Sequence, residues 1–133
     1  MDELVQELVN GILRCTDRSN ELCSETLIRL AYLSADEPEI VWQVILQVID
    51  RRPSDEVLGM LGAGPLEDLM WNHGREFIDR VEQETVTNHK LRGLLSGIYR
   101  GEIDDETWAR IVRLSGRERE MYKLSERSHQ KAQ

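Results

Sequence analysis

The stretch that decides the fold covers residues 59–78 and reads GMLGAGPLEDLMWNHGREFI. It holds four of the chain's nine glycines and one of its three prolines, and both residue types commonly mark helix ends. Glycine accepts the left-handed conformation of a helix C-cap, so we expect Gly62 or Gly64 to end a helix. Proline fits the first helical position, where no N–H is needed, so we expect Pro65 to start the next helix. We expect Gly74 to end that second helix.

The residues after this proline recur at helical spacing. A helix would place on one buried face Leu66, Leu69, Met70 and His73. Glu67 and Asp68 would lie in its first turn, where the positive end of the helix dipole favours acidic side chains. The sequence therefore predicts a short amphipathic helix at the centre of the chain.

Similar apolar spacing extends over the rest of the chain. It predicts helices near residues 4–13, 22–31, 40–49, 57–61, 66–73, 77–85, 91–98 and 105–112. The third segment is rich in β-branched residues, but Gln43, Gln47 and Asp50 leave one narrow polar stripe, which favours a helix buried on most sides. In the second helix, the expected inner face consists of Leu22, Cys23, Leu27, Leu30 and Ala31. We expect an all-α fold of about eight short helices.

Two stretches of the chain resemble each other and suggest an internal repeat. Leu30, Leu33 and Ala35 recur 28 residues later as Leu58, Leu61 and Ala63, and Pro38 is followed after 27 residues by Pro65. Each copy reads as a helix, a corner of small residues, a proline and another helix. Two arrangements remain open, an irregular helical bundle and HEAT- or armadillo-like stacked hairpins.

Length and charge set limits on organisation and partners. We assign residues 1–115 to a single helical domain and 116–133 to a charged C-terminal helix or frayed tail. The net charge is −8. Residues 1–115 carry 22 acidic and 12 basic side chains, so this acidic body disfavours nucleic acid and suits a basic protein partner.

The location of the protein is predicted from its apolar runs and cysteines. The longest apolar run is four residues, 30–33, too short to cross a membrane, and the N-terminus is acidic where a secretory signal would be basic. Cys15 and Cys23 match neither a C-x-x-C redox pair nor a zinc framework. We expect a cytoplasmic protein whose two cysteines are buried, reduced thiols.

A cluster of polar residues near the central stretch is the place to look for chemistry. Glu67, Asp68, His73 and Glu76 suggest a divalent-metal hydrolase as one alternative. Such enzymes need acids from two facing helices, and we find no second inward-facing acidic cluster. We expect His73 to bond a backbone carbonyl, and we identify no nucleophile with its base. The sequence predicts no enzyme, no cofactor and no metal site.

The three tryptophans give the other candidate residues. We expect Trp42 and Trp108 in the core, whereas Trp71 fits either the rim of the core or an exposed anchor for a partner. The residues that we single out for interaction or packing are Trp71, His73, Glu67, Asp68 and Glu76.

A resemblance to a known family rests on the central motif. Residues 62–69 read GAGPLEDL, followed by His73-Gly74 and Phe77-Ile78. The motif resembles the signature of a family of small bacterial proteins catalogued only as a domain of unknown function, and the similarity extends over residues 26–115. The resemblance implies a bacterial origin and an all-helical fold, and it brings no activity.

These observations lead to one hypothesis and two alternatives. We expect a protein–protein interaction module with an acidic surface, of which an inhibitor or immunity-type protein is one form. The alternatives are the metal-dependent hydrolase and a homodimeric structural protein, since a homo-oligomer is compatible with the same sequence.

Overall fold

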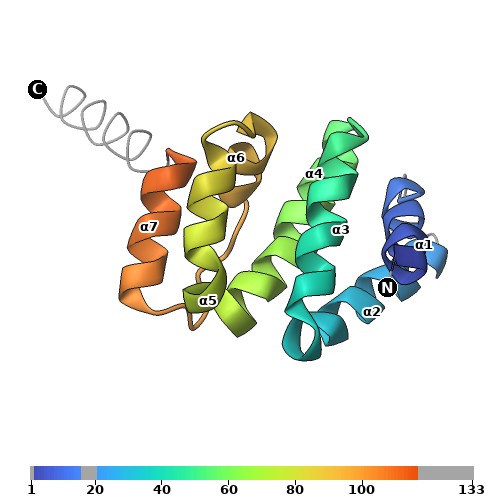
Figure 1. The fold of residues 1–133 in the computed structure, drawn as a ribbon, viewed down its shortest axis with the longest axis horizontal. Coiled ribbons are helices and arrows are strands. Elements are labelled where there is room, and N and C mark those ends of the chain that lie inside the picture. Colours follow the sequence, from blue (N-terminus) through green and yellow to red (C-terminus); the bar gives the residue numbers. More distant parts are fainter. Residues whose placement is uncertain (1, 16–20, 117–133) are drawn as a thin grey trace, which may run out of the picture.

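The fold is seen in a computed structural model that describes residues 2–15 and 21–116, and in these residues it contains helices and no strand (Figure 1). The elements are α1 (Asp2–Leu13), α2 (Glu21–Asp36), α3 (Pro38–Asp50), α4 (Asp55–Leu61), the π-helix η1 (Gly62–Leu66), α5 (Glu67–Thr85), α6 (His89–Leu95) and α7 (Asp105–Ser115). The all-α prediction is confirmed. The predicted tail and the 16–20 loop lie outside the described residues, apart from Gly116.

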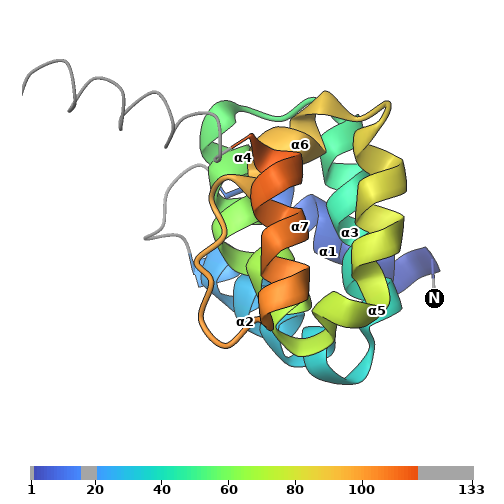
Figure 2. The same cartoon turned by 90° about the vertical axis from the view of Figure 1, so that its left-hand side faces the viewer.

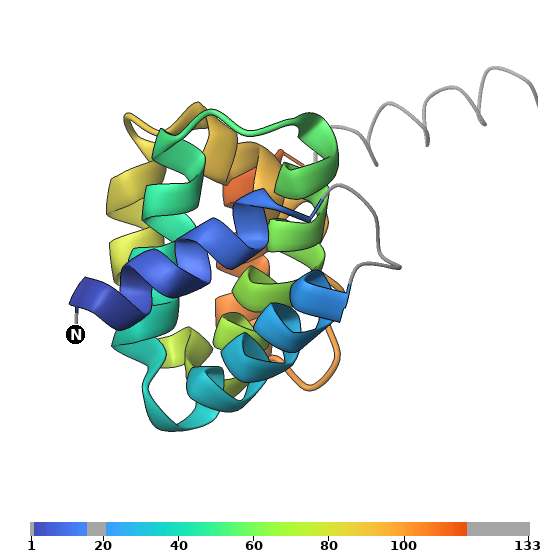
Figure 3. The same cartoon turned by 90° about the vertical axis from the view of Figure 1, so that its right-hand side faces the viewer.

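The helices form an irregular bundle that is longest in the direction from α1 to α7 (Figure 1). At one end α1 crosses α3 and packs on α2, as the view in Figure 3 shows. At the other end α7 packs on α5 and α6 (Figure 2). Since α5 contacts α2 and α3 as well as α6 and α7, it joins the two ends.

The core is centred on α3. Seven of its residues are buried, namely Ile40, Val41, Trp42, Val44, Ile45, Val48 and Ile49. They belong to one cluster of buried apolar side chains that draws on every α-helix of the described chain. The prediction of a helix buried on most sides is confirmed, and so is the core position of Trp42. Trp108 is partly buried and packs against the same cluster.

The central glycines do not end a helix, so this part of the prediction is wrong. Residues 55–72 are helical without interruption, and Pro65 lies inside the π-helix instead of starting a new helix. Gly62 has a right-handed backbone, with φ −70° and ψ −47°. A Cβ on Gly62 would lie 3.0 Å from the carbonyl oxygen of Leu94, so this glycine lets η1 and α6 approach closely.

The predicted helix end at Gly74 corresponds to a kink one residue earlier, at which two helical segments join. Helix α5 continues to Thr85, and it bends at His73, whose φ of −140° and ψ of 31° are not helical (Figure 2). Gly74 is buried, and a Cβ there would lie 3.1 Å from Cγ2 of Thr107 in α7. Like Gly62, it is needed for close packing between helices.

The predicted order of helix, corner, proline and helix is found in the first copy of the repeat and is wrong for the second. In the first copy α2 ends at Asp36, and Pro38 begins α3 after a turn. In the second copy the π-helix replaces the corner, so α4 leads directly into α5. A π-helix inserts an extra residue per turn, which sequence spacing alone does not reveal.

The cysteines are buried as predicted, but the expectation of reduced thiols is wrong. Cys15 and Cys23 form a disulfide, with their Cα atoms 5.0 Å apart. The bond joins the end of α1 to the start of α2, a proximity that follows from how the two helices pack. On the predicted inner face of α2, Leu22 and Ala31 are exposed, because the buried side follows Cys23, Thr26, Leu30 and Ser34.

No helix in the described part of the chain is long and apolar enough to cross a membrane. This agrees with the absence of a long apolar run in the sequence.

Candidate functional site

The candidate site forms where the loop between α6 and α7, residues 96–104, lies along the first half of α5. The backbone N–H of Tyr99 donates to Oε1 of Glu67 at 2.6 Å. The indole Nε1–H of Trp71 donates to the Tyr99 carbonyl oxygen at 2.8 Å. Farther along, Nε of Arg75 lies 3.3 Å from Oδ1 of Asp104. Three side chains of α5 thus hold this loop in place.

The loop and α5 together present an aromatic pair to solvent. The rings of Trp71 and Tyr99 have centroids 6.5 Å apart and planes inclined by 60°. Trp71 is 47% exposed and Tyr99 is 72% exposed. Gly101 passes under the indole with φ +54°, and a Cβ there would lie 2.9 Å from the ring. This position therefore requires glycine both for its backbone and for its space.

His73 fixes the bend of α5 beside this pair. Its Nε2 lies 2.8 Å from the carbonyl oxygen of Ala35 at the end of α2, and its Nδ1 lies 3.1 Å from Oε1 of Glu76. Both ring nitrogens face acceptors, which favours the protonated imidazolium. The Ala35 carbonyl, and next the Glu76 carboxylate, raise the pKa of His73 above its ordinary value. The expected bond from His73 to a backbone carbonyl is confirmed.

A hollow of about 270 Å³ opens next to Trp71. Its lining comes from the bend of α5 and from the loop, and consists of Met70, Trp71, Asn72, His73, Gly74, Arg75, Glu76, Glu102, Ile103 and Asp104. The lining thus contains three carboxylates, one arginine and one histidine. Within the described residues, the carboxylates of Glu76 and Asp104 have partners, and that of Glu102 has none.

The predicted site residues do not all come together. Trp71, His73 and Glu76 line the same hollow, while Glu67 supports the Tyr99 backbone beside it. Asp68 lines a different hollow, with Cys23 and Met60 among its neighbours. Burial there, and next the charge of Glu67, raise the pKa of Asp68.

The described residues contain no group of three or more histidine, cysteine or acidic side chains placed to hold a metal ion. Two further acids of α5 instead form ion pairs with Arg110 of α7, Asp79 at 2.8 Å and Glu82 at 2.9 Å. These acids help to fix α7 on α5.

Sequence reasoning missed the part of the site that the loop contributes, above all Tyr99, Gly101 and Glu102. The local signal there is Asp104, the N-cap of α7, whose side chain accepts from the Thr107 N–H at 3.1 Å. That signal gives the start of α7 but does not show that the preceding loop returns to Trp71, 28 residues earlier in the chain.

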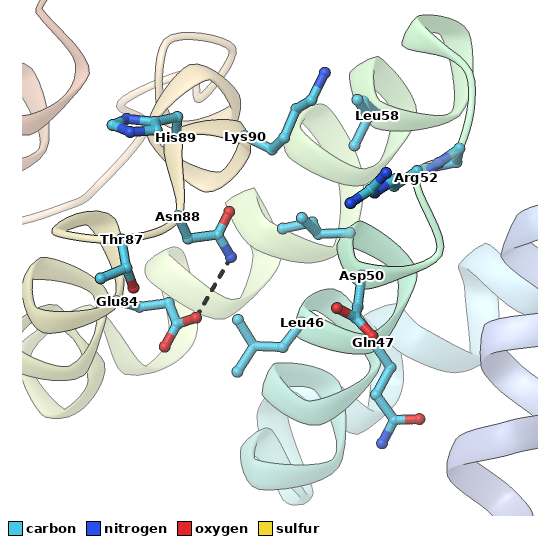
Figure 4. A pocket seen from close by; sticks show the side chains of 12 residues that line it. Leu46, Gln47, Asp50, Arg52, Leu58, Glu84, Thr87, Asn88, His89 and Lys90 are labelled. Atoms are coloured by element: carbon cyan, nitrogen blue, oxygen red, sulfur yellow. Dashed lines mark hydrogen bonds between the residues drawn. The ribbon is translucent and has the colours of Figure 1, made fainter.

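A second hollow, of about 820 Å³, lies between the ends of α3 and α5 and the starts of α4 and α6 (Figure 4). Leu46 lies across from Glu84 and Asn88, which share a hydrogen bond of 3.4 Å. The charges that line this hollow balance, because two acids, Asp50 and Glu84, are matched by two bases, Arg52 and Lys90. It has neither an exposed aromatic pair nor an excess charge that would indicate a ligand.

Comparisons with known proteins give a family and no function. The model of a family described as "Family of unknown function (DUF6869)" matches residues 16–119. No curated protein and no solved structure matches the chain.

Proposed function

The chain belongs to that family of unknown function, and we propose that it works by binding another protein through the surface around Trp71 and Tyr99. The observation that carries this proposal is the exposed aromatic pair, held in a fixed position by the contacts of Glu67 and Gly101. Tryptophan and tyrosine are enriched among the residues that dominate protein interfaces.

The support beneath these rings distinguishes them from other exposed apolar side chains. Tyr32 and Val86 are also largely exposed, at 74% and 75%, yet within residues 2–15 and 21–116 no ring contact or hydrogen bond holds their side chains. The Trp71 indole, in contrast, has its polar N–H satisfied by the Tyr99 carbonyl and leaves its ring available. A ring that is fixed before binding loses little conformational entropy when a partner covers it.

The charge of the chain indicates the kind of partner. An acidic surface attracts a basic protein and speeds the encounter between the two. An inhibitor or immunity-type protein that covers a basic surface fits this combination of charge and anchor. A cytoplasmic location is also part of this proposal. The disulfide between Cys15 and Cys23 argues against it, because disulfides persist mainly in oxidising compartments.

The proposal is tested by affinity capture followed by binding measurements on the purified partner. The full chain would be used as bait at low and high salt, beside a Trp71→Ala/Tyr99→Ala variant. Tyr32→Ala is the matched control, since it removes an exposed aromatic ring outside the hollow. Circular dichroism would show that each bait is folded.

We expect a partner that binds the wild-type chain and Tyr32→Ala alike. Its affinity for the double variant should fall at least about tenfold, the effect of losing one interface hot spot. A partner that binds all three baits equally would place the interface elsewhere and contradict the proposal. Failure to capture any partner at either salt concentration would remove its support.

A further inference from the structure

One aromatic pair in the described part of the chain already carries a cation, the guanidinium of Arg80. The rings of Trp42 and Phe77 have centroids 6.1 Å apart and planes inclined by 60°. The guanidinium carbon of Arg80 lies 5.8 Å from the centroid of Trp42 and 5.0 Å from that of Phe77. Both terminal nitrogens of Arg80 donate to Glu39, at 2.6 and 2.8 Å. An arginine on an aromatic pair, held by a carboxylate, is thus a stable arrangement in this fold.

The pair formed by Trp71 and Tyr99 has similar geometry without the cation. Its centroid distance of 6.5 Å and its angle of 60° match the first pair closely. In the described part of the chain, no arginine or lysine lies over either ring. Glu102, which lines the same hollow as Trp71, is an exposed carboxylate with no partner among those residues.

Nearby arginines of the chain itself are engaged elsewhere. Arg75 pairs with Asp104, and Arg100 pairs with Asp105 while it also donates to the Ile103 carbonyl. These contacts direct both guanidinium groups to the loop and the start of α7. Among the residues that the structure describes, no side chain takes on the second pair the place that Arg80 takes on the first.

We propose that Trp71, Tyr99 and Glu102 bind an arginine side chain in a basic segment of the protein partner. This inference rests on the proposed function and names the chemical group that the site recognises. The guanidinium would lie on the aromatic rings, as Arg80 does, and would donate hydrogen bonds to the Glu102 carboxylate. The hollow of about 270 Å³ gives it room beside the indole.

Arginine fits this site better than lysine for two physical reasons. Its planar guanidinium stacks on aromatic faces, and it donates two parallel hydrogen bonds to one carboxylate. A lysine ammonium is a compact and strongly hydrated charge, which loses more on leaving water. The neutral side chain of citrulline keeps the shape of arginine but removes its positive charge, so it serves as a matched ligand control.

The test is calorimetric titration of the full chain with capped glycine peptides that carry two arginines, two lysines or two citrullines. The protein variants are Trp71→Ala, Trp71→Phe and Glu102→Gln. Trp71→Phe keeps an aromatic face if the alanine variant is poorly folded. Glu56→Gln is the control for net charge, because Glu56 is exposed in the first turn of α4 and lies outside the hollow.

We expect the arginine peptide to bind the wild-type chain and Glu56→Gln alike. Its affinity should fall about tenfold with Trp71→Ala and severalfold with Glu102→Gln, and it should largely survive Trp71→Phe. The lysine peptide should bind severalfold more weakly, and the citrulline peptide should show no measurable binding.

Several results would overturn this inference. Equal affinity for the arginine and citrulline peptides would show that the positive charge is not recognised, yet the proposed protein-binding function could still stand on the capture experiment. Arginine binding that is insensitive to Trp71→Ala would reflect general attraction to an acidic surface. No peptide binding, combined with sedimentation that shows a dimer lost in Trp71→Ala, would assign the surface to a second copy of this chain.

Discussion

The two aromatic pairs in the described residues of this protein have nearly the same geometry and opposite surroundings. Trp42 and Phe77 are 4% and 5% exposed and carry Arg80 on their rings. Trp71 and Tyr99 face solvent and carry no cation from the described chain. The same arrangement of two rings can therefore be buried in the core with an arginine of the chain on it, which we call the closed pair, or exposed at the surface without one, which we call the open pair.

The two pairs are also held by different forces. The first depends on burial in the cluster around α3, where the hydrophobic effect dominates. The second depends on hydrogen bonds at the Tyr99 backbone and on the close approach of Gly101. Mutations should therefore affect stability strongly at the first pair and binding strongly at the second.

The largest expected difference is between two tryptophan truncations. Trp42→Ala should lower the free energy of unfolding by about 3–5 kcal/mol, because it leaves a cavity in the core. Trp71→Ala should cost only about 1 kcal/mol, since half of the ring is already exposed and one hydrogen bond is lost. Urea denaturation measures both. Equal losses would show that the second pair is also a structural element of the core.

The next effect concerns the loop beneath Trp71. Gly101→Ala should lower the free energy of unfolding by about 1–2 kcal/mol, because alanine is strained at positive φ and its Cβ meets the indole. Gly59→Ala is the matched control, since it lies inside α4 with no atom near its Cβ position. Alanine there should raise stability by about 0.5–1 kcal/mol. A neutral Gly101→Ala would mean that the loop does not need its observed conformation.

A smaller effect is expected from the cation of the closed pair. A double-mutant cycle with Arg80→Ala and Glu39→Gln should give a coupling energy of about 0.5–1 kcal/mol, because both side chains are nearly half exposed to solvent. Arg80 lowers the pKa of Glu39 mainly through its hydrogen bonds. The coupling should therefore be present at neutral pH and disappear as acid protonates Glu39. A coupling of zero at neutral pH would remove the internal model for arginine binding.

The smallest expected effect is the pH dependence of the bend beside Trp71. The raised pKa of His73 means that its contribution to stability is complete below the unfolded pKa of about 6.5 and is lost as pH rises through the higher folded pKa. Glu76→Gln should bring the pKa of His73 closer to its ordinary value, because one of the two acceptors loses its charge. Histidine NMR signals followed against pH report this shift, and an unchanged pKa in Glu76→Gln would assign it to Ala35 alone.

The burial of Trp42, one half of the buried aromatic pair, could be predicted from the sequence. The helical spacing around Trp42 predicted both its helix and its burial. Helix N-caps are equally local: the Ser54 side chain, which precedes the acidic first turn of α4, accepts from the Val57 N–H. Such features depend on residues within one or two helical turns, so composition and spacing identify them.

The contacts of the open pair, Trp71 and Tyr99, could not be predicted from local sequence patterns. The sequence predicts that Trp71 lies at the rim of the core or is an exposed anchor. Its contacts, however, come from Tyr99 and Gly101, on a loop distant in sequence. The disulfide and the close packing of Gly62 were missed for the same reason, because each depends on how separate helices meet. A glycine read alone does not tell whether it serves a turn or a contact.

The most direct test of the difference between the two pairs follows the three tryptophan indole N–H signals by two-dimensional NMR. The capped arginine peptide would be added to the ¹⁵N-labelled full chain, with Trp71→Phe used to assign the Trp71 signal. We predict that the Trp71 signal shifts progressively to saturation while the Trp42 signal stays in place, because Arg80 already occupies the Trp42 ring. A Trp71 signal that does not move, or that moves equally with the citrulline peptide, would contradict the account.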